Sequence, residues 1–235
     1  MTSPNDAVRE PPGRGWRYYD LAVALFVAAL LTANIIAVKL IVLGPLILPA
    51  AVVIFPVSYI LGDILTEVYG YRYARRAIWL GFVANLVAVL AIYVAGRLPA
   101  PVFWQDQAAY ETILGFTPRL LLASFVAYLV GEFANSTILA KMKVWSRGRH
   151  LWARTIGSTI VGQGLDSLVF IGIAFSGRMA VPELAIAILS QWLFKSLYET
   201  VATPLTYAVV NALKRSEGVD TFDVDTNLNP FVFEE

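Results

Sequence analysis

Six apolar stretches of this chain are each close to or above the ~20 residues that an α-helix needs to cross a lipid bilayer. Their approximate bounds are 20–43, 46–70, 73–96, 118–142, 154–176 and 185–212. The chain is 58% hydrophobic and 15% charged, whereas soluble domains are about one quarter charged. The sequence therefore predicts an all-α integral membrane protein, with six transmembrane helices in a compact bundle.

Basic residues are concentrated in alternate links between these stretches. Thirteen of the eighteen lysines and arginines lie before the first stretch or just after the second, fourth and sixth stretches. The positive-inside rule places such segments in the cytoplasm. We therefore expect both termini to be cytoplasmic.

Three segments lie outside the predicted transmembrane domain or interrupt it. Residues 1–19 are polar and rich in proline, which predicts a disordered cytoplasmic leader before a domain of residues 20–213. Residues 97–117 form the one long external linker, and its aromatic residues predict either a lid or an interfacial anchor. Residues 214–235 hold six acids and no base from position 216 onward, which predicts a solvated acidic cytoplasmic tail.

Several classes of function lack the residues they need. The chain has no cysteine, and its one histidine, His150, lies in a basic loop, so we expect no thiolate or histidine metal site. The apolar stretches contain no histidine that could activate a serine nucleophile. No glycine-rich phosphate loop precedes a predicted helix. We expect no catalysis, no cofactor and no nucleic-acid partner.

Polar residues repeat at intervals of three or four on five of the six predicted helices, which places them on one face of each helix. Ionisable side chains are costly in a bilayer and normally face the bundle interior. These stripes therefore predict a central polar cavity surrounded by helices, with lipid outside. The candidates for substrate binding are Asn34, Asp63, Glu132, Asn135, Gln163, Asp166 and Lys195, and those for gating or coupling are Glu67, Glu199, Arg75 and Arg76.

Structural roles compete with these assignments. Glu67 lies one turn before a cluster of arginines and can form a surface ion pair or a cytoplasmic gate latch. Asp166 and Lys195 can form a buried pair that serves only the fold. Chemistry alone indicates a small polar solute, a cation or protons. Carboxylates side by side would suit a planar group with adjacent N–H donors, such as a guanine-like edge.

Two weaker patterns concern packing. Ala29, Ala33 and Ala37 form a stripe of small residues, typical of internal helix packing or of a docking face for a second copy or partner subunit. The segments 58–63 and 127–132 resemble each other and each ends in an acid after a glycine. They predict a parallel internal repeat with a site between its halves.

The run Phe55-Pro56 through Gly62-Asp63-Ile64-Leu65-Thr66-Glu67-Val68-Tyr69-Gly70, followed by Ala74-Arg75-Arg76, resembles the signature of a known family. That family is the queuosine-precursor transporters, also called the vitamin uptake transporters. The resemblance covers about residues 20–215. Further similar positions are Asn34, Ala123-Ser124-Phe125-Val126-Ala127-Tyr128, Gly131-Glu132, Ser158-Thr159, Gly162, Asp166-Ser167 and Phe194-Lys195.

The resemblance implies uptake of 7-deazaguanine precursors of queuosine, such as preQ0, preQ1 or queuine, across the bacterial inner membrane. It also implies a fold related to the substrate-binding components of energy-coupling-factor vitamin transporters. Unlike those components, the protein would act without an ATPase module. Asp63, Glu132 and Asp166 would bind the purine-like edge, and Lys195, with Asn34 and Gln163, would meet ring acceptors or hold the acids in position. The alternatives are a binding subunit that needs an ATP-driven partner, or a membrane scaffold. Proton coupling and a homodimer are both left open.

Overall fold

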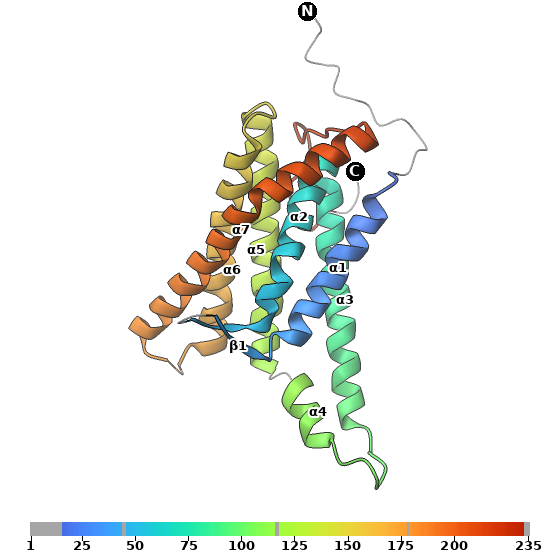
Figure 1. Ribbon diagram of the computed structural model, residues 1–235, viewed down its shortest axis with the longest axis vertical. Coiled ribbons are helices and arrows are strands. Elements are labelled where there is room, and N and C mark those ends of the chain that lie inside the picture. The colour runs from blue at the N-terminus through green and yellow to red at the C-terminus, as the bar shows by residue number, and fades with distance from the viewer. Residues whose placement is uncertain (1–15, 44–45, 116–117, 178, 233–235) are drawn as a thin grey trace, which may run out of the picture.

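The computed structural model describes residues 16–43, 46–115, 118–177 and 179–232. Most of the predicted leader therefore lies outside the described residues. Long helices run alongside one another in alternating directions (Figure 1). Their bounds are α1 Tyr19–Ile36, α2 Phe55–Tyr69, α3 Tyr71–Arg97, α5 Pro118–Trp145, α6 Leu151–Phe175 and α7 Val181–Glu217. The helical class predicted from the sequence is confirmed.

The link between α1 and α2 differs from the two adjoining helices, 20–43 and 46–70, that hydropathy predicts. Strands β1 Leu40–Leu43 and β2 Leu46–Pro49 pair antiparallel, and the 3₁₀ helix η1 Ala50–Val53 leads into α2. Apolar runs rich in Ile and Val are compatible with either a helix or a strand. Proline lacks the N–H that a helix interior requires, and α2 accordingly starts with Pro56 in its first turn. The helices expected over residues 20–43 and 46–70 were therefore predicted too long, because residues 40–43 and 46–53 form the two strands and the 3₁₀ helix instead.

Because successive long helices run in opposite directions, four segments lie together at one end of the bundle, which we call the basic end. It contains the start of α1, the α2–α3 junction at Gly70, the α5–α6 turn and the end of α7 (Figure 1). Most of the arginines and lysines of the links lie here. The β-hairpin and the α6–α7 link lie at the opposite end.

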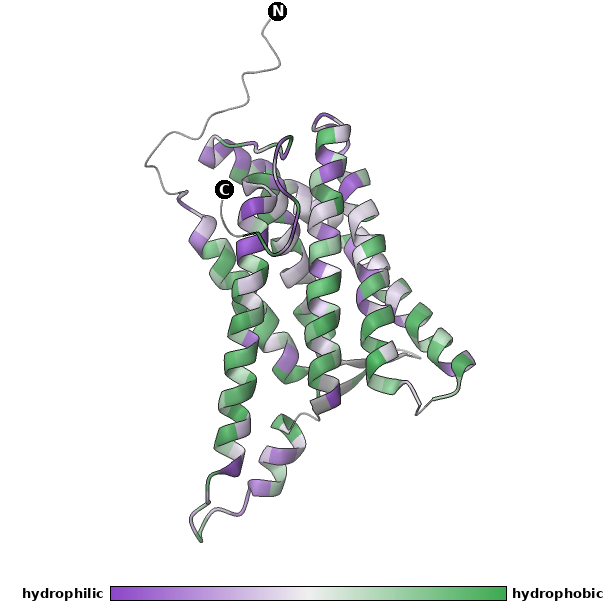
Figure 2. Cartoon of the chain, turned by 180° about the vertical axis from the view of Figure 1, so that it is seen from behind, coloured by the Kyte–Doolittle hydropathy of each residue, from purple (hydrophilic) through white to green (hydrophobic). Residues whose placement is uncertain are grey.

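The long helices consist of hydrophobic residues along much of their length (Figure 2). Large apolar side chains recur every three or four residues on the exposed faces of α3 and α7. The described chain has four helices long and apolar enough to cross a membrane: α1, α3, residues Leu121–Trp145 of α5, and α6. An apolar exterior around buried charged groups is the arrangement of a multi-pass membrane protein. The exposed apolar residues are Leu80, Val83, Val87, Leu90 and Val94 on α3 and Leu189, Leu193, Leu197, Val201 and Leu205 on α7.

The alanine stripe of α1 serves internal packing. Ala29 and Ala33 are 5% and 1% exposed, and Ala37 is half-buried. The stripe faces the protein interior, where α1 packs against α2 and α3. The prediction of a docking face for a partner or second copy is therefore wrong.

The linker of residues 97–117 contains a short helix, α4 Gln107–Leu114, which packs against the end of α3. The Tyr110 hydroxyl donates to the Ile92 carbonyl at 3.0 Å, and the Gln107 amide donates to the Gly96 carbonyl at 3.0 Å. Phe103 and Trp104 are exposed. Attachment to the outer turns of α3 favours the interfacial anchor over the lid.

Helices α5 and α6 make the most extensive contact in the bundle, and two glycines allow it. A Cβ added at Gly131 would lie 2.8 Å from Cβ of Asp166 and 3.2 Å from the Gly162 carbonyl oxygen. A Cβ at Gly162 would lie 2.8 Å from Cβ of Asn135. These glycines therefore let α5 and α6 approach closely and bring their polar residues together.

We expect Gly162→Ala to destabilise the protein by about 1–3 kcal/mol, because the new methyl group forces α5 and α6 apart. Gly172→Ala, on the same helix, is the matched control, since nothing lies within 4 Å of its added Cβ. It should be neutral or stabilising by up to about 1 kcal/mol. Unfolding of the purified variants in detergent measures both effects, and equal stability of the two would contradict the proposed close contact.

Candidate functional site

Seven of the predicted polar residues meet inside the bundle, between α2, α5, α6 and α7. Six of them are at most 9% exposed, and Lys195 is half-buried. We call this group the polar cluster. Its members are Asp63 on α2, Glu132 and Asn135 on α5, Gln163 and Asp166 on α6, and Lys195 and Glu199 on α7.

Direct contacts join the members across helices. The Asn135 amide donates to Asp63 Oδ1 at 2.8 Å, which joins α5 to α2. Lys195 Nζ lies 2.5 Å from Asp166 Oδ2, which joins α7 to α6. Glu132 approaches α2 closely, because its Oε2 lies 3.2 Å from the position of a Cβ at Gly62. The predicted pair of Lys195 with Asp166 is thus present.

Many oxygens of the polar cluster have no partner. Among the described residues of the cluster, five buried acceptor oxygens make no hydrogen bond. Buried polar atoms are nearly always paired in folded proteins, and an unpaired one costs about 1–3 kcal/mol. The cluster is therefore suited to a ligand that supplies hydrogen-bond donors. The five atoms are Asp63 Oδ2, Glu132 Oε2, Asn135 Oδ1, Gln163 Oε1 and Glu199 Oε1.

Asn34 is positioned differently from the prediction. Its amide donates to Asn85 Oδ1 at 2.6 Å, and the Asn85 amide donates to the Gly81 carbonyl at 3.2 Å. Both side chains thereby join α1 to α3. Among the described residues, no hydrogen bond links Asn34 to the polar cluster. We therefore assign Asn34 to helix packing.

Glu67 lies one turn beyond Asp63, at the basic end, and is completely buried. Arg154 donates to both of its carboxylate oxygens, at 2.8 and 2.6 Å, and Lys214 Nζ lies 2.6 Å from Oε1. Lys143 donates to the Glu67 carbonyl oxygen and lies 3.5 Å from Oε1. We call these four residues the Glu67 cluster; it ties α2 to α5, α6 and α7.

The arginines expected to accompany Glu67 have other positions. Arg75 donates to the carbonyl oxygens of Asn227 and Asn229, each at 2.9 Å, and Arg76 is exposed. In the sequence, Arg154 and Lys143 belong to the basic residues that follow the fourth apolar stretch, so they were interpreted as topology signals and their pairing with Glu67 was missed. No local pattern separates them from exposed neighbours such as Arg149.

Glu199 was expected at a gate. It instead lies close enough to Asp63 and Glu132 to interact with both electrostatically.

The C-terminal segment folds back over the basic end and is not the solvated tail that was expected. Both carboxylate oxygens of Asp223 accept the Tyr71 backbone N–H at 3.0 Å. The Tyr71 hydroxyl donates to the Leu228 carbonyl, and the Trp79 indole donates to the Pro230 carbonyl. Tyr71 and Trp79 lie on α3, so the segment covers the beginning of that helix.

Asp220 connects this segment to the Glu67 cluster. Its carboxylate lies 2.6 Å from Lys143 Nζ and 2.8 Å from Lys214 Nζ. Partial burial alone would raise the pKa of Asp220, but the hydrogen bonds and charges of the two lysines outweigh it and lower the pKa. Asp220 therefore stays ionised and adds a second anion to the three cations.

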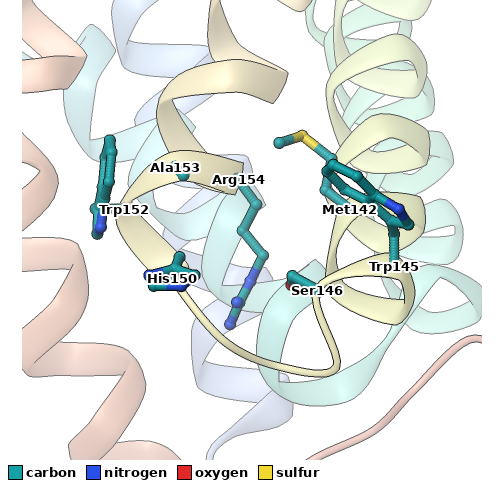
Figure 3. Close-up of a pocket in the computed structure, with 7 residues that line it drawn as sticks. All are labelled: Met142, Trp145, Ser146, His150, Trp152, Ala153 and Arg154. Carbon is teal, nitrogen blue, oxygen red and sulfur yellow. The ribbon is translucent and has the colours of Figure 1, made fainter.

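A pocket of about 270 Å³ opens beside the α5–α6 turn (Figure 3). Two tryptophans and a methionine give it an apolar wall, and Arg154 lies across it. No member of the polar cluster lines this pocket, so it is separate from the predicted central cavity. Its lining residues are Met142, Trp145, Ser146, His150, Trp152, Ala153 and Arg154.

Residues 49–209 match the family described as "Putative vitamin uptake transporter". The chain belongs to this family. The matched region contains the whole polar cluster of this vitamin uptake transporter family member, together with Glu67 and Arg154. Asn34, Lys214 and the C-terminal segment lie outside it.

Curated relatives carry names that specify a cargo. The chain is 30% identical to the "Probable queuosine precursor transporter" of Bacillus subtilis over 192 residues, which cover 80% of this chain and 83% of the relative. It is 30% identical to the "Queuosine precursor transporter" of Escherichia coli over 121 residues, 52% of each chain. A Haemophilus influenzae relative, also named "Probable queuosine precursor transporter", is 28% identical over 52% of this chain and 49% of its own length. No solved structure matches the chain.

Proposed function

We propose that this family member is an uptake transporter that carries queuosine precursors, a class of 7-deazaguanines, across a bacterial inner membrane. The group of unpartnered buried acceptors in the polar cluster is the observation that carries this proposal. A 7-deazaguanine presents a ring N–H next to an exocyclic amine, and a carboxylate can accept both. The names of the relatives support the same class of cargo.

The substrate would lie between α2 and the α5–α6 pair, with α7 closing the site. Asp63, Glu132 and Glu199 would accept donors from the purine-like edge. Asp166 holds Lys195 near this edge, where the ammonium would donate to a ring acceptor. Six of the seven members of the polar cluster are buried in this conformation, as expected for an occluded intermediate.

We further propose six membrane crossings, by α1, α2 with the preceding hairpin, α3, α5, α6 and α7, with both termini in the cytoplasm. The excess of positive charge at the basic end supports this orientation. The Glu67 cluster then acts as the cytoplasmic gate, because opening that side must separate α2 from Arg154, Lys143 or Lys214.

A binding subunit dependent on an ATP-driven partner is the second candidate. The buried alanine stripe removes the sequence feature that favoured it. Purified protein reconstituted alone in liposomes separates the two candidates, with radiolabelled preQ0 as the probe and empty liposomes as the control. We expect saturable uptake that unlabelled queuine inhibits. Uptake that appears only after an ATPase module is added would favour the subunit, and no uptake with or without one would reject both.

A further inference from the structure

The polar cluster contains more carboxyl groups than its cations can neutralise. Asp63, Glu132 and Glu199 are 1%, 4% and 5% exposed, and Asp166 is 9% exposed. Among the described residues of the cluster, Lys195 supplies the one positive charge, and its ammonium is bound to Asp166. Three carboxyl groups are left without a cation bound to them.

Hydrogen bonding does not compensate for this charge. Asp63 receives one hydrogen bond, from the Asn135 amide. Asp63 Oδ2, Glu132 Oε2 and Glu199 Oε1 are buried oxygens that make none among the described residues. A carboxylate buried without a cation or donors costs several kcal/mol, so such a group binds a proton instead.

The groups around the three acids do not supply the missing charge. The cations of the Glu67 cluster are bound to Glu67 and Asp220, so three positive charges face two negative ones. That leaves one positive charge about a helical turn away from Asp63. The remaining ionisable groups near the three acids are Tyr59, Tyr128, Asp166, Lys195 and Glu67.

We propose that Asp63, Glu132 and Glu199 form a proton-binding site and that one proton enters the cell with each substrate molecule. This inference rests on the proposed transport of 7-deazaguanines. The purine-like edge carries two N–H donors next to a carbonyl acceptor. One ionised carboxylate accepts the two donors, and a protonated carboxyl group donates to the carbonyl. The proton binds a carboxyl oxygen from the outside, remains there during the crossing and leaves to the cytoplasm after the substrate.

The test uses the full-length protein in liposomes with labelled preQ0, whose 7-substituent is a nitrile. Its 7-substituent has no basic alkyl amine, and its exocyclic amine is conjugated with the ring and stays neutral near pH 7, so any coupled proton is bound to the protein. The membrane potential is held at zero, and the interior is set one pH unit above the exterior. One proton per substrate predicts accumulation of about tenfold at steady state, because one pH unit is a tenfold proton gradient. A protonophore should abolish this accumulation.

Entry of preQ0 to equal concentrations on both sides, whatever the pH gradient, would overturn the coupling and leave the proposed function intact. Absence of any protein-dependent entry would overturn both. We expect the substitutions Glu132→Gln, Glu199→Gln and Asp63→Asn to lower accumulation towards equal concentrations. Asp225→Asn is the matched control, because it removes an exposed carboxyl group outside both the polar cluster and the Glu67 cluster, and it should still concentrate preQ0. Persistence of tenfold accumulation in all three cluster variants would show that the proton binds elsewhere.

Discussion

Asp166→Asn and Lys195→Ala should each lower the affinity for a queuosine precursor by about 30-fold or more. Each change removes one partner of the 2.5 Å ion pair that joins α6 to α7 within the polar cluster. Loss of one member of a buried charged pair at a binding site typically costs about 2–5 kcal/mol, because the other charge is left unpaired. Initial rates of uptake, measured against substrate concentration in cells unable to make queuosine, report this loss.

Asn34→Ala is the informative comparison. Asn34 has the same side-chain chemistry as a site residue but pairs with Asn85 in the α1–α3 contact. We expect it to lower thermal stability and to leave substrate affinity within about threefold of the original value. Uptake that is unchanged by both Asp166→Asn and Lys195→Ala would show that the polar cluster is not the substrate site.

Glu67→Ala should reduce the free energy of unfolding by about 3–5 kcal/mol, the usual cost of removing one partner from a buried ion pair. The carboxylate is fully buried and is bound by Arg154, Lys143 and Lys214. Its removal leaves three cations at the junction of four helices, with Asp220 as the nearest anion. Equilibrium unfolding of the purified protein in detergent measures the change.

Arg76→Ala provides the control for this prediction, because Arg76 is an exposed charge at the same end of the bundle. A surface substitution of this kind normally changes stability by no more than about 0.5 kcal/mol. Equal stability of the Glu67 and Arg76 variants would mean that the Glu67 cluster does not hold the basic end together.

Hydropathy and helical spacing predicted the helical class and the inward position of six of the seven candidate substrate-binding residues, with Asn34 as the exception. Charge in the membrane interior is informative because its cost restricts where Asp63, Glu132 or Asp166 can lie. The spacing of these residues indicated which face each helix turns inward. It indicated the pair of Asp166 with Lys195 but not the pair of Asn34 with Asn85.

Other features depend on contacts between distant segments and left no local signal. The apolar residues of β1 and β2 suit a helix as well as a strand, so the hairpin was missed. Arg154 binds Glu67 across a separation of 87 residues, and the group of basic residues to which it belongs in the sequence is explained equally well by membrane topology. The C-terminal acids have the composition of a solvated tail, but Asp223 and Asp220 bind Tyr71 and two lysines.

Equilibrium binding of a ligand panel to the purified protein tests the central claim most directly. The panel contains preQ0, preQ1, queuine and guanine, together with vitamins that lack a guanine-like edge, such as biotin. We predict saturable binding of the 7-deazaguanines, loss of that binding in Asp166→Asn, and no binding of biotin. Binding of the vitamins with the 7-deazaguanines excluded, or 7-deazaguanine binding that Asp166→Asn leaves unchanged, would contradict the proposed substrate and site.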